Sequence, residues 1–340
     1  MKILIIGADG FIGCHLVDHI LTKKPNWEIH TLDLSNNNLA EYQSHPKLFT
    51  TQGDMTKMSD WIEEKIKLCD VVLPLAAIAT PATYVQDPLK IFSLDFEANL
   101  AIIRLCVKHS KRVIFPSTSE VYGMCTDSEF DEEKSHLILG PIHKERWIYS
   151  CSKQLIDRLI FAYGKRNGLP YTLFRPFNWI GPKQDNIKNS KTGGSRVVIQ
   201  FLGNILRGEN IQLVDGGRQH RSFVYVEDGI EALVKIIENT DNCASGRIFN
   251  IGNPHNISSI RSLAETLLEL AQKYPQHEAN AKKVQLMDIP AADYYGTGYQ
   301  DVQARVPAIW RAQTHLQWQP KTDLITSLSK TVDYYLHDAS

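Results

Sequence analysis

The 340-residue sequence lacks a surplus of charge of either sign, a long apolar run and closely paired cysteines. Its 37 Lys and Arg balance 38 Asp and Glu, whereas a protein that binds nucleic acid usually carries a large basic excess. The longest mostly apolar run, from Val71 to Ala79, is far shorter than the roughly 20 residues that a membrane-spanning helix needs. We therefore expect neither nucleic acid nor a membrane as a partner.

Signals for targeting and for metal binding are also missing. The amino terminus runs from Met1-Lys2 directly into the apolar stretch 3–6, without the apolar region and cleavage site of a signal peptide. The six cysteines show no CxxC spacing and no His neighbours at metal-ligand spacing, which argues against disulfides and a zinc site. We expect a cytoplasmic protein with reduced thiols and no bound metal.

Short β-branched runs alternate with amphipathic stretches through the first half, which is typical of βαβ units. Apolar residues at three- and four-residue steps indicate the helices between the strands. The pattern predicts an α/β protein with a Rossmann-type doubly wound parallel sheet. The expected strands are 2–6, 28–33, 70–75, 112–116 and 171–175, and the expected helices are 11–21, 61–68, 91–108 and 147–166.

Two units are expected at this length, because domains average about 150 residues. The first, 1–176, carries the sheet together with segments that return from the carboxy-terminal half. The second, 177–340, is a smaller α/β lobe that closes over the edge of the sheet, and its polar stretch 274–283 is predicted as a mobile loop. Within this lobe we expect a strand at 211–214 and helices at 196–206, 228–238, 260–272 and 324–336.

A glycine-rich turn is the first candidate site. Gly7, Gly10 and Gly13 directly follow the first expected strand and open a helix. The first two permit a tight turn whose backbone N–H groups approach a pyrophosphate, and Gly13 lets the helix pack closely against the strand. Asp33 ends the next strand about 20 residues later, where a carboxylate accepts hydrogen bonds from an adenosine ribose and repels a 2′-phosphate. The pattern predicts NAD rather than NADP.

A tyrosine and a lysine form the second candidate site. Tyr149 and Lys153 are four residues apart on one expected helix, so they project from the same face. The ammonium favours a phenolate, and together with an oxidised nicotinamide it would bring the tyrosine from a pKa near 10 toward 7. Thr118 and Glu120 follow the strand 112–116, at the edge where such sheets bind ligands. We predict a redox site with Tyr149 as the base and Thr118 bonded to a substrate hydroxyl.

Together these motifs resemble the extended short-chain dehydrogenase/reductase family, the NAD-dependent epimerases and dehydratases that modify nucleotide sugars. The sequence is most similar to the decarboxylase half of the bifunctional polymyxin-resistance enzymes of the ArnA type. The resemblance covers essentially the whole chain. It rests on the strings DVVLPLAAIATP (70–81), IFPSTSEVYGM (114–124), RWIYSCSK (146–153), FRPFNWIGP (174–182) and YYGTGYQDV (294–302).

This resemblance implies an activity: NAD-dependent oxidation at C4 of UDP-glucuronate and decarboxylation, giving UDP-4-keto-pentose (UDP-4-keto-arabinose) and CO2. Formyl transfer is not expected, because the chain begins at its first strand, ahead of which the bifunctional enzymes carry a formyltransferase domain. One departure from the wider family is Asp95, near which many relatives carry an asparagine.

The resemblance also implies residue roles. The catalytic group would be Tyr149, Lys153, Thr118, Ser119, Glu120 as an acid/base, and Arg305 as a proton donor or, because an arginine pKa exceeds 12, as a clamp for the carboxylate and enolate. Cofactor contacts would come from Gly7, Gly10, Phe11, Ile12, Gly13, Asp33, Asp54, Met55, Ala76, Tyr149 and Lys153. Substrate contacts would come from Ala79, Tyr84, Arg146, Asn178, Arg196, Gln212, Arg221 and Tyr299, with the UDP part along 212–221.

Other interpretations stay open at this point. A UDP-xylose or UDP-apiose synthase would reduce the 4-keto intermediate again with bound NADH, and a nucleotide-sugar 4-epimerase or 4,6-dehydratase would release no CO2. A non-enzymatic NAD sensor would keep the fold without needing Tyr149, Lys153, Thr118 or Glu120. The expected helices 91–108 and 147–166 carry apolar residues on more than one face. This pattern suits the four-helix seam of a homodimer like that of similar enzymes, which we expect here, and it equally suits packing inside one chain.

Overall fold

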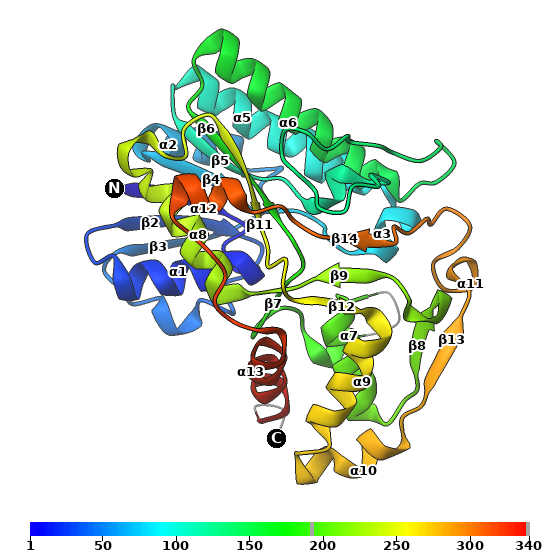
Figure 1. Ribbon diagram of the computed structural model, residues 1–340. Helices are drawn as coiled ribbons and strands as arrows, with labels where there is room; N and C mark the ends of the chain where they lie inside the picture. Colours follow the sequence, from blue (N-terminus) through cyan, green and yellow to red (C-terminus); the bar gives the residue numbers. More distant parts are fainter. Residues whose placement is uncertain (191–193, 338–340) are drawn as a thin grey trace.

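Seven parallel strands form the central sheet, in the order β11-β6-β5-β4-β1-β2-β3. The structure is a computed structural model that describes residues 1–190 and 194–337 (Figure 1). The chain first adds β2 and β3 on one side of β1. It then crosses to the other side of β1 and adds β4, β5, β6 and β11 there, so the order of the strands switches between β1 and β4. The bounds are β1 Lys2–Ile6, β2 Glu28–Asp33, β3 Leu48–Gln52, β4 Val71–Pro74, β5 Arg112–Pro116, β6 Tyr171–Pro176 and β11 Arg247–Ile251.

Helices cover both faces of this sheet. Successive side chains of a strand point to opposite faces, and here both faces are apolar, so each needs helices to cover it. Ile3 and Ile5 pack in the same apolar cluster as α1 (Phe11–Lys23), α8 (Val226–Glu238) and α12 (Trp310–Leu316). Leu4 and Ile6 pack in another cluster, on the opposite face. That cluster includes α2 (Ser59–Leu68), α5 (Asn99–Lys108) and α6 (Trp147–Asn167).

A smaller lobe lies beside the carboxyl end of the sheet and has its own apolar core, drawn in green, yellow and red in the lower part of Figure 1. Its helices are α7 Val197–Arg207, α9 Ile260–Ala271, α10 Pro275–Lys283 and α13 Leu324–His337. Its short sheets pair β7 Trp179–Ile180 with β10 Val224–Tyr225, β8 Ile211–Val214 with β13 Leu286–Ile289, and β9 His220–Ser222 with β12 Ile257–Ser259 and β14 Ala304–Arg305.

The connections over the sheet edge are short helical pieces. They include α3 Pro81–Gln86, α4 Pro88–Ile91, a π-helical segment Phe92–Ala98, a 3₁₀ turn Ser119–Tyr122 and α11 Ala291–Tyr295. Within the described ranges, no helix combines the length and the apolar character that crossing a bilayer requires.

The predicted Rossmann-type parallel sheet is confirmed, but two local predictions are wrong and two strands of the sheet were missed. The stretch predicted as the loop 274–283 is α10, whose first turn begins with Pro275 and whose Ala281 is buried against the lobe core. The single helix predicted over 91–108 is divided into the end of α4, the π-helical segment and α5. Strands β3 and β11 were not predicted, because Leu48–Gln52 has only one buried residue and Arg247–Ile251 lies far from the other strands in sequence.

Candidate active site

The glycine turn after β1 is crowded by backbone. Gly7 has φ +87°, and a Cβ on it would lie 2.5 Å from the amide nitrogen of Ala76. A Cβ on Gly13 would lie 2.5 Å from the carbonyl oxygen of Gly7. Only glycine fits at these two positions, which lets α1 begin close to the sheet and leaves a cavity of about 750 Å³ over the strand ends.

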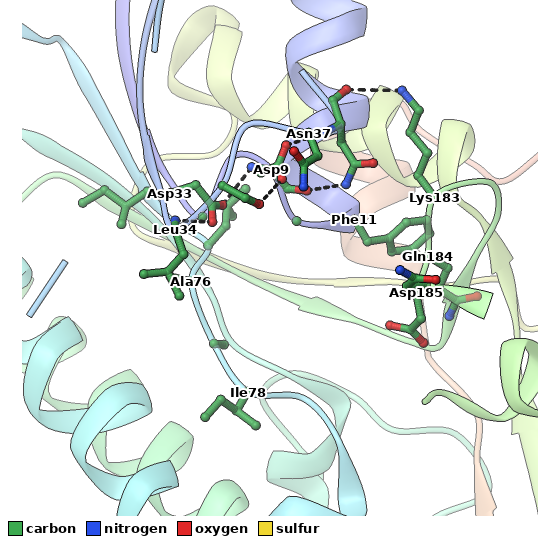
Figure 2. A pocket seen from close by; sticks show the side chains of 18 of the residues that line it. Asp9, Phe11, Asp33, Leu34, Asn37, Ala76, Ile78, Lys183, Gln184 and Asp185 are labelled. Atoms are coloured by element: carbon green, nitrogen blue, oxygen red, sulfur yellow. Dashed lines mark hydrogen bonds between the residues drawn. The ribbon is translucent and has the colours of Figure 1, made fainter. Parts of the chain in front are cut away.

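Asp33 ends β2 at the rim of this cavity (Figure 2). Its Oδ2 accepts a hydrogen bond from the backbone N–H of Asp9 (2.8 Å), and its Oδ1 accepts one from the N–H of Leu34 (2.6 Å). Burial raises the pKa of Asp33, while these two backbone N–H groups act against that rise. Asp9 in turn accepts hydrogen bonds from Ser35 and from the N–H of Asn38. The glycine turn and the loop after β2 are thereby held together.

The residues of this cavity fit a dinucleotide. The glycine cradle leaves room for a pyrophosphate next to the start of α1, and Asp33 lies where a ribose would bind. Of the predicted cofactor residues, Gly13 lies behind the turn, Ile12 lines the adjoining cavity, and Tyr149 and Lys153 belong to that adjoining site. Those that line the dinucleotide cavity are Gly7, Gly10, Phe11, Asp33, Asp54, Met55 and Ala76.

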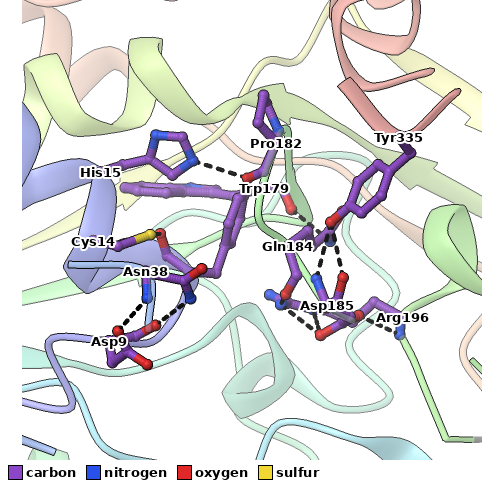
Figure 3. Close-up of polar contacts among 11 residues, drawn as sticks. Asp9, Cys14, His15, Asn38, Trp179, Pro182, Gln184, Asp185, Arg196 and Tyr335 are labelled. Carbon is purple, nitrogen blue, oxygen red and sulfur yellow. Dashed lines mark hydrogen bonds and ion pairs between the residues drawn. The ribbon is translucent and has the colours of Figure 1, made fainter. Parts of the chain in front are cut away.

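The segment after β7 closes one side of the same cavity (Figure 3). The carbonyl oxygen of Pro182 lies 2.9 Å from Nε2 of His15 on α1, and the amide of Gln184 donates to the carbonyl oxygen of Trp179 at 3.0 Å. Asp185 accepts a hydrogen bond from the backbone N–H of Arg196 and pairs with its guanidinium at 2.8 Å. The carbonyl of Asp185 also accepts from the hydroxyl of Tyr335 at 2.9 Å.

A second cavity, of about 300 Å³, adjoins the first between the sheet edge and the smaller lobe. Most of the predicted catalytic and substrate residues line it, although they come from segments separated by up to 226 positions (305 − 79). Arg146 and Lys153 lie directly behind this lining, with side chains 1% exposed. The lining includes Ala79, Tyr84, Thr118, Ser119, Glu120, Tyr149, Asn178, Arg196, Gln212, Arg221, Tyr299 and Arg305.

Tyr149 lines this second cavity and is almost fully buried. Its ring is stacked on that of Tyr84, with centroids 4.6 Å apart, and Lys153 Nζ is 5.9 Å from the Tyr149 ring centroid. Burial, reinforced by the negative charge of Asp95, raises the pKa of Tyr149 well above its usual value, although a hydrogen bond with Thr118 acts in the opposite direction. The expectation that Lys153 and an oxidised nicotinamide together lower this pKa concerns the protein with its cofactor bound, and it stays a prediction. Burial also lowers the pKa of Lys153 itself.

Glu120 is clamped between two buried arginines. Its Oε2 accepts from Arg146 at 2.5 Å, and its Oε1 pairs with Arg305 of β14. Burial would raise the pKa of Glu120, but the charges of Arg146 and Arg305 outweigh that effect and lower it to about 2. The side chain of Arg305 is only 6% exposed and comes from a strand, so Arg305 is not part of a salt bridge on a helix surface.

The other predicted substrate residues surround this cluster. Arg221 donates to Asp301 at 2.6 Å and to the backbone carbonyl of Val302, while Tyr299 lies against the guanidinium of Arg146, 5.1 Å from ring centroid to Cζ. The amide of Asn178 donates to the carbonyl of Ser222. Gln212 is exposed at the cavity wall. Arg196 is paired with Asp185 and covers the ring of Phe11 at 4.9 Å, so it stands where the two cavities meet.

Comparisons with known proteins agree with this geometry. A family model described as the NAD dependent epimerase/dehydratase family matches residues 3–252. The chain belongs to this family. A solved structure of PbgP3 protein from Burkholderia pseudomallei is 50% identical, with a TM-score of 0.90 over 99% of this chain and 96% of that one.

More distant structures of the family share the fold. UDP-glucose 4-epimerase from Thermotoga maritima, solved with UDP-glucose, is 24% identical, with a TM-score of 0.81 over both whole chains. UDP-glucuronic acid 4-epimerase from Bacillus cereus, solved with UDP-glucuronic acid and NAD, is 22% identical, with a TM-score of 0.82 over both whole chains. The chain is thus an enzyme of the NAD-dependent epimerase/dehydratase type, and the predicted cofactor NAD is confirmed.

Several site residues were not found from the sequence. Three of them are aspartates: Asp9 holds the glycine turn, Asp185 pairs with Arg196, and Asp301 pairs with Arg221. Single carboxylates in loops have no characteristic spacing in the sequence, so no pattern pointed to them. Tyr295 stacks on Tyr299 with centroids 4.0 Å apart. The string YYGTGYQDV, which was used for the resemblance, contains Tyr295 and Asp301 and was the one available pointer to them.

Proposed function

We propose that this protein oxidises C4 of UDP-glucuronate with NAD and then decarboxylates the sugar, giving UDP-4-keto-pentose. The observation that carries the proposal is the position of Glu120 with its two arginines, next to Tyr149 in one cavity. Two buried guanidiniums share one carboxylate, so the cluster has a positive charge left for an anionic group of the substrate. A sugar carboxylate satisfies that charge.

The chemistry follows from the residues in this cavity. Thr118 orients the C4 hydroxyl, and Tyr149 takes its proton. The oxidised nicotinamide, when bound, accepts the hydride from C4. The resulting ketone lies β to the C6 carboxylate, so CO2 leaves because the electrons left at C5 delocalise into that ketone. C5 then takes up one proton, which balances the one that the hydroxyl released.

The structure favours electrostatic roles for Glu120 and Arg305 over roles as proton donors. With its pKa lowered to about 2, Glu120 is an anion at neutral pH and has no proton to donate. Its charge orients Arg146 and Arg305, and Arg305, on β14, lines the cavity. We infer that Arg305 clamps the carboxylate and then the enolate, as an electrostatic stabiliser of the developing negative charge.

A UDP-xylose or UDP-apiose synthase is the nearest rival, because it shares every step through decarboxylation. The experiment is to incubate the purified protein with UDP-glucuronate and NAD, to follow NADH by absorbance and to identify the product by mass spectrometry. We expect one NADH and one CO2 for each UDP-4-keto-pentose formed. Turnover far beyond a catalytic amount of NAD, without free NADH, would identify the synthase instead.

The same experiment also tests the remaining rivals. A 4-epimerase or 4,6-dehydratase predicts no CO2 from UDP-glucuronate and activity on a neutral sugar nucleotide. Incubation with UDP-glucose is therefore the matched substrate control, because UDP-glucose differs from UDP-glucuronate only in carrying a hydroxymethyl group in place of the carboxylate. Conversion of UDP-glucose but not of UDP-glucuronate would contradict the role of the two arginines.

A further inference from the structure

Asp95 is a buried carboxylate that the steps above leave without a role. It lies in the π-helical segment Phe92–Ala98 with a side chain 0% exposed, and its Oδ1 is 3.6 Å from Nζ of Lys153, which is 1% exposed. Its Oδ2 accepts a hydrogen bond from the backbone N–H of Ile78 at 3.2 Å. Among the described residues no donor comes within hydrogen-bond distance of Oδ1, so Lys153 is the group that compensates its charge.

The other charged groups around Tyr149 and Lys153 are compensated by arginines. Glu120, in the 3₁₀ turn, is held by Arg146 of the connection before α6 and by Arg305 of β14. Asp157 of α6 pairs with Arg175 of β6 at 3.4 Å. On α3, Tyr84 is a neutral phenol. Lys153 donates its one short hydrogen bond to the carbonyl oxygen of Pro116 at 3.1 Å, so its ionic partner is Asp95.

This pairing changes what Lys153 can do for Tyr149. A lone buried ammonium would stabilise a phenolate, but an ammonium next to a carboxylate has no net charge to offer. We propose that Asp95 is a positioning residue: it pairs with Lys153, cancels the ammonium charge beside Tyr149, and keeps Tyr149 protonated until the positive charge of the oxidised cofactor is added.

The arrangement suits a reaction that must return a proton. With the Asp95–Lys153 pair neutral, Tyr149 keeps the proton that it takes from the C4 hydroxyl until the decarboxylated sugar needs one. Burial and Asp95 raise the pKa of Tyr149, which agrees with this role. The inference rests on the proposed function only for the choice of Tyr149 as the base.

The test measures ionisation of Tyr149 in the protein without cofactor or substrate. Tyrosinate absorbance is titrated for each variant, and the titration of the matching variant that also carries Tyr149→Phe is subtracted. In Asp95→Asn the ammonium is no longer cancelled, so we expect Tyr149 to ionise about 1 to 2 pH units lower than in the wild type. The matched control is Glu97→Gln, which removes an exposed charge from the same π-helical segment and should leave the midpoint unchanged.

A double variant sharpens this test. Asp95→Asn/Lys153→Met removes both charges, so the midpoint should return to that of the wild type. If Asp95→Asn does not fold, the double variant is compared with Lys153→Met: both lack the ammonium, and Tyr149 must ionise at lower pH in the one that also lacks the carboxylate. Equal midpoints in Asp95→Asn and the wild type, or in the double variant and Lys153→Met, overturn the proposal.

The result is separable from the fate of the proposed function. The titration uses neither UDP-glucuronate nor NAD, so a protein that releases no CO2 still decides the role of Asp95. In the enzyme supplied with NAD and an oxidisable nucleotide sugar, Asp95→Asn should move the acid limb of NADH formation in the same direction as the titration. A merely structural role for Asp95 would lower the rate at every pH and leave that limb in place.

Discussion

The dinucleotide cavity and the sugar cavity adjoin each other but are built in opposite ways. The first is shaped by backbone, at Gly7 and Gly13, where a side-chain atom would meet main-chain atoms at 2.5 Å. The second is shaped by charge, with the half-buried Glu120 held between the buried Arg146 and Arg305. We infer that damage to the first acts through packing and folding, whereas damage to the second acts through protonation and chemistry.

The largest expected effect is on the chemistry of the sugar cavity. Tyr149→Phe keeps the ring stack on Tyr84 but removes the proton acceptor, so NADH formation should fall by on the order of 10³-fold. Initial rates measure the effect on the reaction, and calorimetry measures the affinity for the nucleotide sugar. The affinity should hardly change. Tyr163→Phe, on the same helix but in the core behind the sheet, is the control. An unchanged rate in Tyr149→Phe would remove this residue from the reaction.

The second effect is on stability, and it shows whether charge or packing holds the cluster of Glu120 with its two arginines in the sugar cavity. Glu120→Gln leaves Arg146 and Arg305 buried without their carboxylate, which should lower the free energy of unfolding by about 3 kcal/mol at neutral pH. The pKa of Glu120 is depressed to about 2, so its contribution is present above the unfolded value of about 4.3 and is lost as the pH falls toward 2. The difference between variant and wild type should therefore shrink below about pH 4.

Urea denaturation over a pH series measures this difference. The control is Glu278→Gln, because Glu278 pairs with Lys282 at the surface and should contribute less than about 1 kcal/mol. A penalty for Glu120→Gln that stays the same at every pH would mean that packing, not charge, holds the cluster.

The third effect belongs to the dinucleotide cavity. Gly7→Ala meets both a positive φ and the backbone of Ala76, so the unfolding free energy should fall by about 3 kcal/mol, and NAD affinity should fall with it. Gly168→Ala separates the two causes. Gly168 also has a positive φ, but a Cβ there would meet no other atom of the described residues within 4 Å, so the free energy of unfolding should fall by only about 1 kcal/mol. Equal losses in urea denaturation would show that crowding at Gly7 is unimportant.

The smallest expected effect is on the choice of cofactor. Asp33→Asn keeps an oxygen that can accept from the N–H of Asp9 but removes the charge that repels a 2′-phosphate. The preference for NAD over NADP should fall by about tenfold, or roughly 1.4 kcal/mol, in calorimetric binding constants. Asp54→Asn, at a half-buried position in the same cavity, should change both affinities alike. A preference unchanged by Asp33→Asn would contradict this role of the carboxylate.

Prediction from the sequence worked best where a function depends on neighbours in the chain. Strands β1, β2 and β5 have the predicted bounds, and the glycine turn and Asp33 meet because parallel strands end at the same edge. The helix predicted over 91–108 failed because apolar periodicity does not distinguish an α-helix from one interrupted by a π-helical segment. The helix α10 was missed because its polar residues give no clear apolar face, although Ala281 packs into the core.

The charges of the sugar cavity lay outside the reach of periodicity and spacing. Glu120 and Arg305 are 185 positions apart, and without the resemblance to a known family nothing pointed to their contact. The contact of Asp95 with Lys153 was not predicted by either route, because the π-helical turn that points the carboxylate at the lysine has no signature in the sequence.

Local order along the chain was enough to establish the parallel sheet, the dinucleotide turn and the preference for NAD, since hydrophobic periodicity and glycine act through the backbone of adjacent residues. The protonation states of Tyr149, Lys153 and Glu120 were decided only by the folded molecule. Each depends on how deeply the group is buried and on which charge faces it, and both are set by segments that come together from distant parts of the chain.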